Sequence, residues 1–199
     1  MTNSYIETIK KRRSQYSLGK DLPLPQAEVT ALIQEAIRQG PSAFNSQSSR
    51  ALILFGTQSI KFWGLAKEAL QKVIPADSFA QTSKKIDGFA AGGGTVLFFE
   101  DQDVVKGLQE KFAAYADNFP IWSEHSTGIA QYAVWTALAS VNIGASLQHY
   151  NPLVDAAVQK EWNTPASWKL RAQMPFGSNQ APVAEKTFIE DGKRFLVFG

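Results

Sequence analysis

The sequence predicts an α+β fold in which helices flank a central mixed β-sheet. Three observations carry this prediction. Apolar residues recur at helical spacing between Pro25 and Gly40, and two short apolar runs at 51–55 and 95–99 are typical of buried strands. A further stretch of 29 residues, from Ser126 to Val154, contains no Asp, Glu, Lys or Arg. It is long enough for an extended buried helix.

The first half of the chain alternates predicted helices and strands. In chain order we expect helix 4–13, helix 25–39, strand 51–55, helix 57–74, strand 95–99 and helix 102–115. Ser4 with Glu7 forms a capping box at the first start, Pro25 is a favoured first helical residue, and Thr57 is the expected cap of the third helix. The polar segment 81–87 is assigned to no element. Gly92-Gly93-Gly94 is interpreted as a flexible lead into the second strand.

The second half is dominated by the uncharged stretch 126–154. Gln131 and Gln148 are among the polar residues that interrupt it, so we interpret it as a buried helix and not as a membrane span. A helix that is apolar on every face needs cover all round, which predicts burial at a subunit interface. Another helix is expected over 152–162. Extended segments follow at 168–174 and 194–198, with a turn at Pro175-Phe176-Gly177.

Composition excludes several classes of protein. No internal repeat or linker is visible in the 199 residues, which predicts one domain over 1–199. The absence of cysteine removes disulfides and thiolate chemistry and fits the cytoplasm. The two histidines have no metal-ligand spacing, so no metal is expected. A net charge of +2 from 20 basic and 18 acidic residues predicts neither nucleic acid nor an anionic membrane as partner. The N-terminus lacks the apolar region of a signal peptide.

Two short runs carry the functional signal. Arg12-Arg13-Ser14-Gln15-Tyr16 places two guanidinium groups beside a hydroxyl, a donor array suited to a phosphate dianion. The run from Pro41 to Arg50 collects amides and hydroxyls in a loop that can line the polar edge of a flat heterocycle. Each run alone is also explained as a solvated helix end or an ordinary turn. Their coincidence favours a phosphorylated cofactor over a nucleophile or a metal.

Together with a third run, Gly144 to Pro152, these motifs resemble the nitroreductase family. Arg12-Arg13-Ser14, the loop 41–47 and the run 144–152 after the long apolar helix match the flavin-binding stations of that family in order and spacing. The run 147–152 and the absence of a longer insertion are similar to a short bacterial and fungal group within it. The resemblance covers essentially the whole chain. It implies a nitroreductase-like fold, a bound FMN, and a homodimer with its long helix at the interface.

The resemblance also implies which residues hold the cofactor. Arg12, Arg13, Ser14 and Tyr16 would contact the phosphate and the polar edge of FMN. Ser42, Asn45 and Gln47 would line the flavin from its other side, from the partner subunit. Leu147, Gln148 and His149 would lay backbone over the ring and donate an amide hydrogen bond toward N5. Arg194, with Lys193 or Lys186, would complete the phosphate clamp.

Tyr16 departs from the family pattern, because many relatives carry Arg or Lys there. A phenol donates one hydrogen bond but supplies no full positive charge to the flavin. The six aromatic residues considered as covers of the ring are Phe44, Phe79, Phe89, Tyr115, Phe119 and Trp122.

The implied reaction is hydride transfer from NADH or NADPH through flavin N5 to a small nitroaromatic or quinone-type acceptor. The chemistry then resides on the flavin, so no catalytic side chain is predicted. Two alternatives stay open at this point. One is a flavin-binding regulatory or stress-response protein whose turnover is incidental, and the other is an interaction domain without a cofactor.

Overall fold

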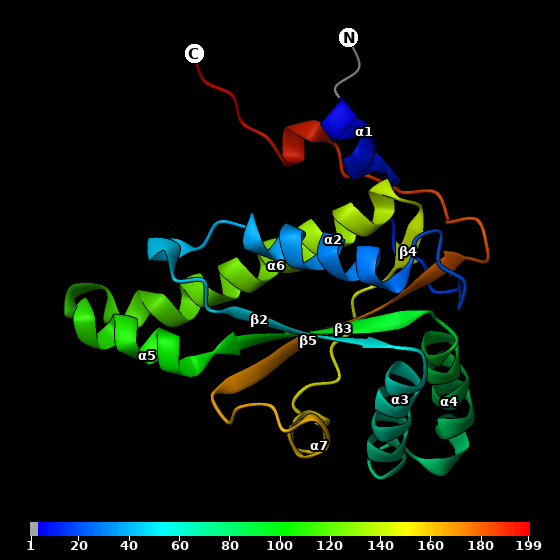
Figure 1. The fold of residues 1–199 in the computed structure, drawn as a ribbon. Coiled ribbons are helices and arrows are strands. Elements are labelled where there is room, and N and C mark those ends of the chain that lie inside the picture. The colour runs from blue at the N-terminus through cyan, green and yellow to red at the C-terminus, as the bar shows by residue number, and fades with distance from the viewer. Residues whose placement is uncertain (1–3) are drawn as a thin grey trace.

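Helices cover both faces of a central sheet in the computed structural model, which describes residues 4–199 (Figure 1). The strands are β1 (Leu18–Gly19), β2 (Ser49–Phe55), β3 (Gly94–Asp101), β4 (Ile143–Ala145) and β5 (Trp168–Asn179). The helices are α1 (Ser4–Lys11), α2 (Gln26–Arg38), α3 (Gly56–Gln71), α4 (Ala76–Ala90), α5 (Gln102–Lys111), α6 (Phe119–Ser140) and α7 (Asp155–Trp162). Three short 3-10 turns are η1 (Ala43–Asn45), η2 (Ala113–Asn118) and η3 (Asp191–Lys193). The predicted α+β class is confirmed.

The sheet has the strand order β1-β5-β3-β2, and β4 also pairs with β5. Each of these strand pairings is antiparallel, and a parallel contact occurs as an isolated bridge between Ser14 and Ala145. The described sheet is therefore antiparallel where the sequence predicted a mixed one. One reason is that the chain reverses direction across α3 and α4, so β3 runs antiparallel beside β2.

The central strand β3 builds two cores because its side chains alternate between the faces of the sheet. Val96 and Phe98 join a cluster with α2 and α6. Leu97 and Phe99 join a second cluster with α3, α4 and α7. These four side chains are at most 1% exposed. A strand buried on both faces explains the unbroken apolar run in the sequence.

The structure differs from the sequence prediction in three segments. Residues 81–87, left unassigned, lie inside α4, whose buried residues are Ile86 and Phe89 and whose charged side chains are exposed. The uncharged stretch does not form one helix, because α6 starts seven residues earlier at Phe119 and stops at Ser140. The expected turn at 175–177 lies inside β5, where the Pro175 carbonyl accepts a hydrogen bond from the Ser146 N–H.

Two smaller predictions also change. The cap position of α3 is Phe55, not Thr57, and no side-chain cap bond forms there. The glycines before β3 serve close packing more than flexibility. A Cβ on Gly94 would lie 2.4 Å from the Phe176 ring and 2.7 Å from the Leu54 carbonyl oxygen.

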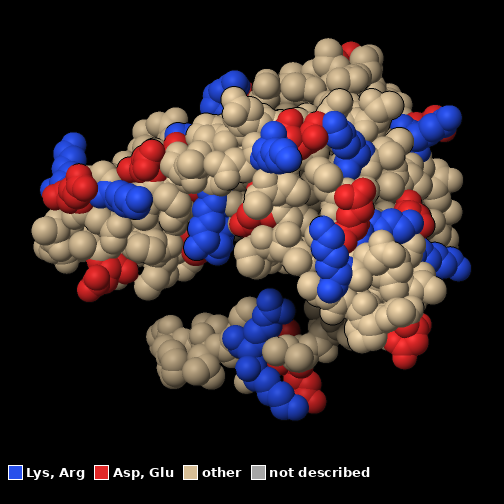
Figure 2. All heavy atoms as spheres, turned by 90° about the horizontal axis from the view of Figure 1, so that it is seen from below, with Lys and Arg blue, Asp and Glu red and all other residues tan. Residues whose placement is uncertain are grey.

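Charges of both signs are interspersed on the face of the molecule seen from below (Figure 2). Two of the salt bridges that α3 makes join Lys61 to Glu161 and Lys67 to Asp87. This face therefore presents no broad field of one sign.

Candidate functional site

The N-terminal basic run lines a cavity of about 460 Å³, which we call the arginine cavity. It lies between the segment that follows α1 and the start of the C-terminal tail, residues 181–199. Its lining residues are Arg12, Arg13, Ser14, Gln15, Tyr16, Ser17, Pro182, Val183, Ala184 and Lys186. Four of the predicted cofactor residues, together with Lys186, thus meet at one cavity. Three of these five residues, Arg12, Arg13 and Lys186, carry a positive charge.

Arg12 provides the strongest indication that a ligand belongs there. Its guanidinium carbon lies 4.4 Å from the centroid of the Trp135 ring on α6. Its Nε is buried and has no hydrogen-bond partner among residues 4–199. Leaving a buried charged donor unsatisfied is costly, so such groups are nearly always paired. A phosphate oxygen would supply the missing acceptor.

The residues next to Arg12 connect this cavity to the run 144–152, which begins in β4. Ser14 forms the isolated bridge with Ala145, and the Gln15 N–H donates to the Ala145 carbonyl at 2.9 Å. The Trp135 indole N–H donates to the same oxygen at 3.1 Å. The first and third predicted stations are therefore side by side.

In the third run, residues 144–152, neighbouring backbone N–H groups differ in whether they have a hydrogen-bond acceptor. The Gln148 N–H donates to the Gln173 carbonyl at 2.7 Å, and its side-chain amide donates to the Ser146 hydroxyl at 3.1 Å. The Leu147 and His149 N–H groups, by contrast, have no acceptor within the described chain. Of the three residues predicted to lie over the ring, Leu147 and His149 keep a backbone N–H that no described residue accepts. The His149 side chain is exposed.

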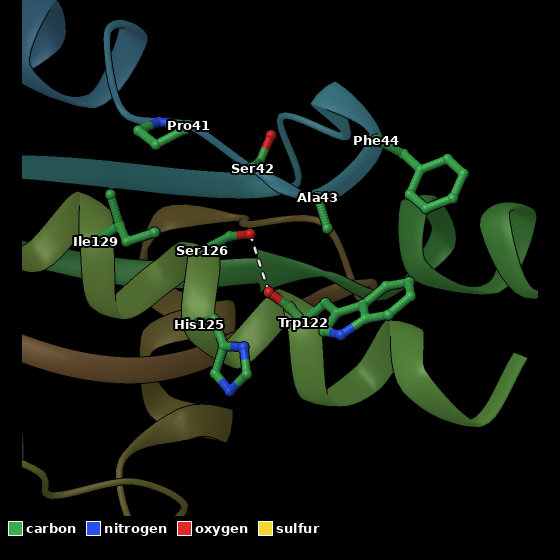
Figure 3. Close-up of a pocket in the computed structure, with 8 residues that line it drawn as sticks. All are labelled: Pro41, Ser42, Ala43, Phe44, Trp122, His125, Ser126 and Ile129. Atoms are coloured by element: carbon green, nitrogen blue, oxygen red, sulfur yellow. Dashed lines mark hydrogen bonds between the residues drawn. The ribbon is translucent and has the colours of Figure 1, made fainter. Parts of the chain in front are cut away.

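The second station forms part of another cavity, of about 380 Å³, which we call the tryptophan cavity (Figure 3). Its lining residues are Pro41, Ser42, Ala43, Phe44, Trp122, His125, Ser126 and Ile129. The loop after α2 supplies one wall and the first turns of α6 supply the other (Figure 3). The Ser126 hydroxyl donates to the Trp122 carbonyl at 2.9 Å, so the polar group on α6 is turned back onto its own helix.

The loop itself has an unusual backbone. Phe44, Asn45 and Gln47 have φ angles of 57°, 49° and 48°, in the left-handed region that residues with a Cβ seldom adopt. The Ser42 hydroxyl stabilises the loop by accepting from the Gln47 N–H at 3.0 Å. The Asn45 and Gln47 side chains are left exposed. Residues held in such conformations cluster at ligand-binding sites.

Four of the six aromatic candidates form one cluster, in which Tyr115, Phe119 and Trp122 surround Phe44, and two of the four, Phe44 and Trp122, line this cavity. The Phe44 ring lies 4.9 Å from Phe112, 5.3 Å from Phe119 and 6.0 Å from Trp122, measured between centroids. Tyr115 packs at 6.1 Å from the same ring. The other two candidates, Phe79 and Phe89, belong to the core on the far side of the sheet. They do not line either cavity.

Lys193 and Arg194 lie in the exposed C-terminal tail. Lys193 pairs with Glu190 at 2.9 Å, and the Arg194 guanidinium rests 5.4 Å from the ring of its neighbour Phe195. A single chain therefore does not bring these two cations to the arginine cavity. Lys186 is the basic residue of the tail that lines it.

The two cavities lie at opposite ends of α6. Trp122 lines the tryptophan cavity, and the Trp135 ring lies against the Arg12 guanidinium. The two tryptophans are separated by thirteen positions on α6. At 1.5 Å per residue the separation is about 20 Å. Figure 1 shows the same arrangement, with the loop after α2 and the segment after α1 at opposite ends of the α2/α6 layer.

Two contacts of the site escaped the sequence analysis. Trp135 supports Arg12, although it lies in the apolar stretch that was interpreted as packing alone. Gln15 is 5% exposed and joins the cavity wall by donating to the Ala181 carbonyl at 2.6 Å and accepting from the Ser17 N–H at 3.1 Å. The signal for Gln15 was a polar residue inside a basic run, whereas nothing local in the sequence marked Trp135.

Metal and membrane sites are not evident among residues 4–199. No group of three or more His, Asp or Glu side chains is placed there to hold a metal ion. No helix in the same range has the length and apolar content needed to cross a bilayer.

Known proteins match this chain over most of its length. The sequence model of the nitroreductase family matches residues 9–178. The putative nitroreductase HBN1 of Saccharomyces cerevisiae is 36% identical over 190 residues, which cover 94% of each chain. The nitroreductase FRM2 of the same yeast is 34% identical and covers 96% of this chain and 95% of its own.

A solved structure is similar over nearly the whole fold. The nitroreductase CinD of Lactococcus lactis, in complex with chloramphenicol, has a TM-score of 0.91 and 51% identity. The match covers 98% of this chain and 100% of that one. On the family match and the identity to these relatives, the chain belongs to the nitroreductase family.

Proposed function

We propose that this protein is an FMN-dependent oxidoreductase that uses NADH or NADPH to reduce small nitroaromatic or quinone-type acceptors. The observation that carries the proposal is the buried Arg12 Nε without an acceptor among residues 4–199, on a residue that lines a cavity together with the cationic side chains Arg13 and Lys186. A phosphate dianion matches this donor set in charge and geometry. Backbone N–H groups without acceptors at Leu147 and His149 stand on the adjoining segment, where a ring with polar edges would find donors.

Each residue then has a physical role in holding FMN. Arg12 and Lys186 neutralise the phosphate, and Ser14 and Tyr16 offer hydroxyl donors to the polar edge. Arg13 has one guanidinium nitrogen already engaged, at 2.5 Å from the Ala184 carbonyl, so it anchors the tail as well as lining the cavity. Bound FMN supplies a site that accepts hydride from a nicotinamide and passes it to an oxidant. The chain itself orients the ring and excludes water.

The residues that line the tryptophan cavity support the proposed class of acceptor. Its walls include the aromatic rings of Phe44 and Trp122 and the aliphatic Ile129, and a flat aromatic acceptor would stack there. Complexes of CinD with 4-nitrophenol and with chloramphenicol support an acceptor of this kind. A complex of CinD with nicotinic acid supports a nicotinamide as the donor.

We also propose that the working form is a homodimer. The loop 41–47 and the arginine cavity lie about 20 Å apart along α6, so a second copy is the natural source of the missing wall of each site. Large apolar side chains on α6 stay uncovered in one chain, with Ile121 56%, Ile129 38% and Tyr132 39% exposed. An interface over these residues would cover them.

An absorbance spectrum of the purified protein tests the proposal directly. Bound FMN is expected to give a yellow protein, whose colour bleaches on adding NADH or NADPH without oxygen and returns on adding 4-nitrophenol or a quinone. A colourless protein that fails to bind added FMN contradicts the proposal. A yellow protein that neither donor bleaches identifies a flavin-binding protein without this activity.

A further inference from the structure

One buried carboxylate, Glu100, lines neither of the two cavities described above. Glu100, near the end of β3, is 0% exposed. A buried carboxylate persists only when hydrogen bonds or opposite charges compensate the loss of water. Both of its oxygens are used, because the hydroxyls of Ser48 and Ser49 each donate to one of them at 2.5 Å. These serines join the loop 41–47 to β2.

The next residue, Asp101, holds the same loop by another route. Its carboxylate accepts from Arg50 Nη2 at 3.1 Å, and its N–H donates to the Ser48 carbonyl at 3.0 Å. Arg50 Nη1 in turn donates to the carbonyl of Gln47 at 2.5 Å. Two consecutive carboxylates of β3 therefore fix Gln47 and the two serines that follow it.

The loop needs such anchoring because its backbone is strained. Phe44, Asn45 and Gln47 all have positive φ angles, a conformation that persists only when the surroundings impose it. The aromatic rings around Phe44 hold the first part of the loop. Hydrogen bonds to Glu100 and Asp101 hold its last part, so both ends of the loop are fixed by contacts.

A purely structural role explains Glu100 poorly. Burial raises the pKa of Glu100, the hydrogen bonds from Ser48 and Ser49 lower it, the nearby Glu124 raises it and Arg50 lowers it. Because the folded pKa lies above the unfolded value, this group favours the fold at low pH and loses that contribution as pH rises through the folded pKa. The buried group therefore stabilises the fold less once it is ionised, and a neutral side chain of the same shape avoids that loss.

We propose that Glu100, with Asp101 beside it, is a positioning residue that preorganises the loop 41–47 for the flavin. The proposal rests on the function proposed above, in which Ser42, Asn45 and Gln47 line the cofactor. Glu100 acts through Ser48 and Ser49, and Asp101 acts through Arg50. Binding to a loop that is already ordered costs less entropy than binding to a mobile one, which is how a residue outside the site raises affinity.

The test compares two variants of the full chain with a matched control. Glu100→Gln keeps the shape and removes the charge, and Arg50→Met breaks the second route at a partly exposed position. The control, Ser59→Ala, removes an equally buried hydroxyl that contacts Thr95 at 2.7 Å near the other end of β3. Three quantities are measured on each protein: the melting temperature at pH 7.5, hydrogen exchange of the cofactor-free loop, and the Kd for FMN by fluorescence quenching.

Glu100→Gln is expected to melt at the wild-type temperature or above it, while its Kd for FMN rises fivefold or more. Exchange of the Asn45, Ser46 and Gln47 N–H groups is expected to accelerate at least threefold, because their acceptors lie within the loop. Arg50→Met is also expected to raise the Kd for FMN and to accelerate exchange in the loop. Ser59→Ala is expected to melt earlier with an unchanged Kd and unchanged loop exchange.

Wild-type Kd and loop exchange in both Glu100→Gln and Arg50→Met would overturn the proposal. If Glu100→Gln fails to fold, Arg50→Met decides the question by itself. A wild-type protein that does not bind FMN would instead contradict the proposed function. The loop exchange of the cofactor-free variants still tests the positioning role in that case.

Discussion

Arg12 is the residue on which the proposed phosphate site depends most. Its guanidinium is held over Trp135, and its Nε has no acceptor among residues 4–199. Arg12→Ala is expected to raise the Kd for FMN tenfold to a hundredfold, because a charge-assisted hydrogen bond contributes about 1.5–3 kcal/mol. Titration of cofactor-free protein with FMN measures the change. Lys10→Ala is the control, since it removes one positive charge from an exposed position on α1 and leaves the cavity intact. Equal affinities of Arg12→Ala and Lys10→Ala would remove Arg12 from the site.

His149 tests whether any ionisable side chain shares the chemistry. Its side chain is exposed beside a backbone N–H without an acceptor, so an imidazole could act as an acid in the oxidative half-reaction. We expect no such role. His149→Gln is expected to retain flavin and to keep both half-reactions within about tenfold, well short of the roughly 10²–10⁴ that a true general acid contributes. Stopped-flow absorbance of each half-reaction measures this. A thousandfold loss confined to reoxidation, at normal flavin content, would make His149 catalytic.

Residues that act through neighbours in the sequence could be predicted, and those that act through the fold could not. Arg12, Ser14 and Tyr16 meet at one cavity because they are nearly contiguous. Trp135 reaches Arg12 only because α6 packs against α1, a contact that no local pattern encodes. Gln148 was predicted for its place in the third run, and the sheet then engages its N–H with Gln173.

At the scale of the elements, the glycine run before β3 is a packing device. A methyl group on Gly94 would clash with the Phe176 ring and the Leu54 carbonyl, so Gly94→Ala is expected to destabilise the fold by about 1–3 kcal/mol. Gly107 lies inside α5, and a methyl group added there would meet nothing within 4 Å. Gly107→Ala is expected to stabilise by up to about 1 kcal/mol, because Gly is a poor helix former. Urea unfolding of both variants distinguishes the two effects. Equal shifts in the two proteins would show that close packing at Gly94 contributes nothing.

Helices and strands could be predicted where the apolar residues follow one clear pattern along the sequence. The spacing of Val29 and Ile33 marked α2, and the unbroken apolar run marked β3, because both elements face the core directly. The bounds of α4 and β5 could not be predicted in the same way. Most of α4 is solvated, so its apolar signal is thin. Pro175 fits inside β5 although it has no N–H to donate, because its carbonyl accepts a hydrogen bond from the neighbouring Ser146 N–H.

At the scale of the whole molecule, the uncovered apolar surface predicts an obligate homodimer. The chain ends in Phe195, Leu196, Val197 and Phe198, which are 56%, 80%, 91% and 89% exposed. Surface of this kind is unusual in a monomer and typical of large interfaces. Sedimentation at micromolar concentration is expected to show a dimer. Leu196→Asp with Phe198→Asp is expected to weaken it, and Lys193→Asp, on the same tail, serves as the charge control. A stable monomer loaded with FMN would contradict the prediction.

Mixed dimers test whether each flavin site is shared between two chains. One chain carries Arg12→Ala, and the other carries Asn45→Gly with Gln47→Gly, where glycine accepts the positive φ angles without strain. If each site combines the arginine cavity of one chain with the loop 41–47 of its partner, both lesions fall in one site and the other site is intact. The mixed dimer, co-expressed with two different tags and purified through both, is then expected to bind about half the FMN of the wild type. The two parent homodimers are the controls, because each carries a lesion in both sites. Binding no better than that of the parents would place every site within a single chain.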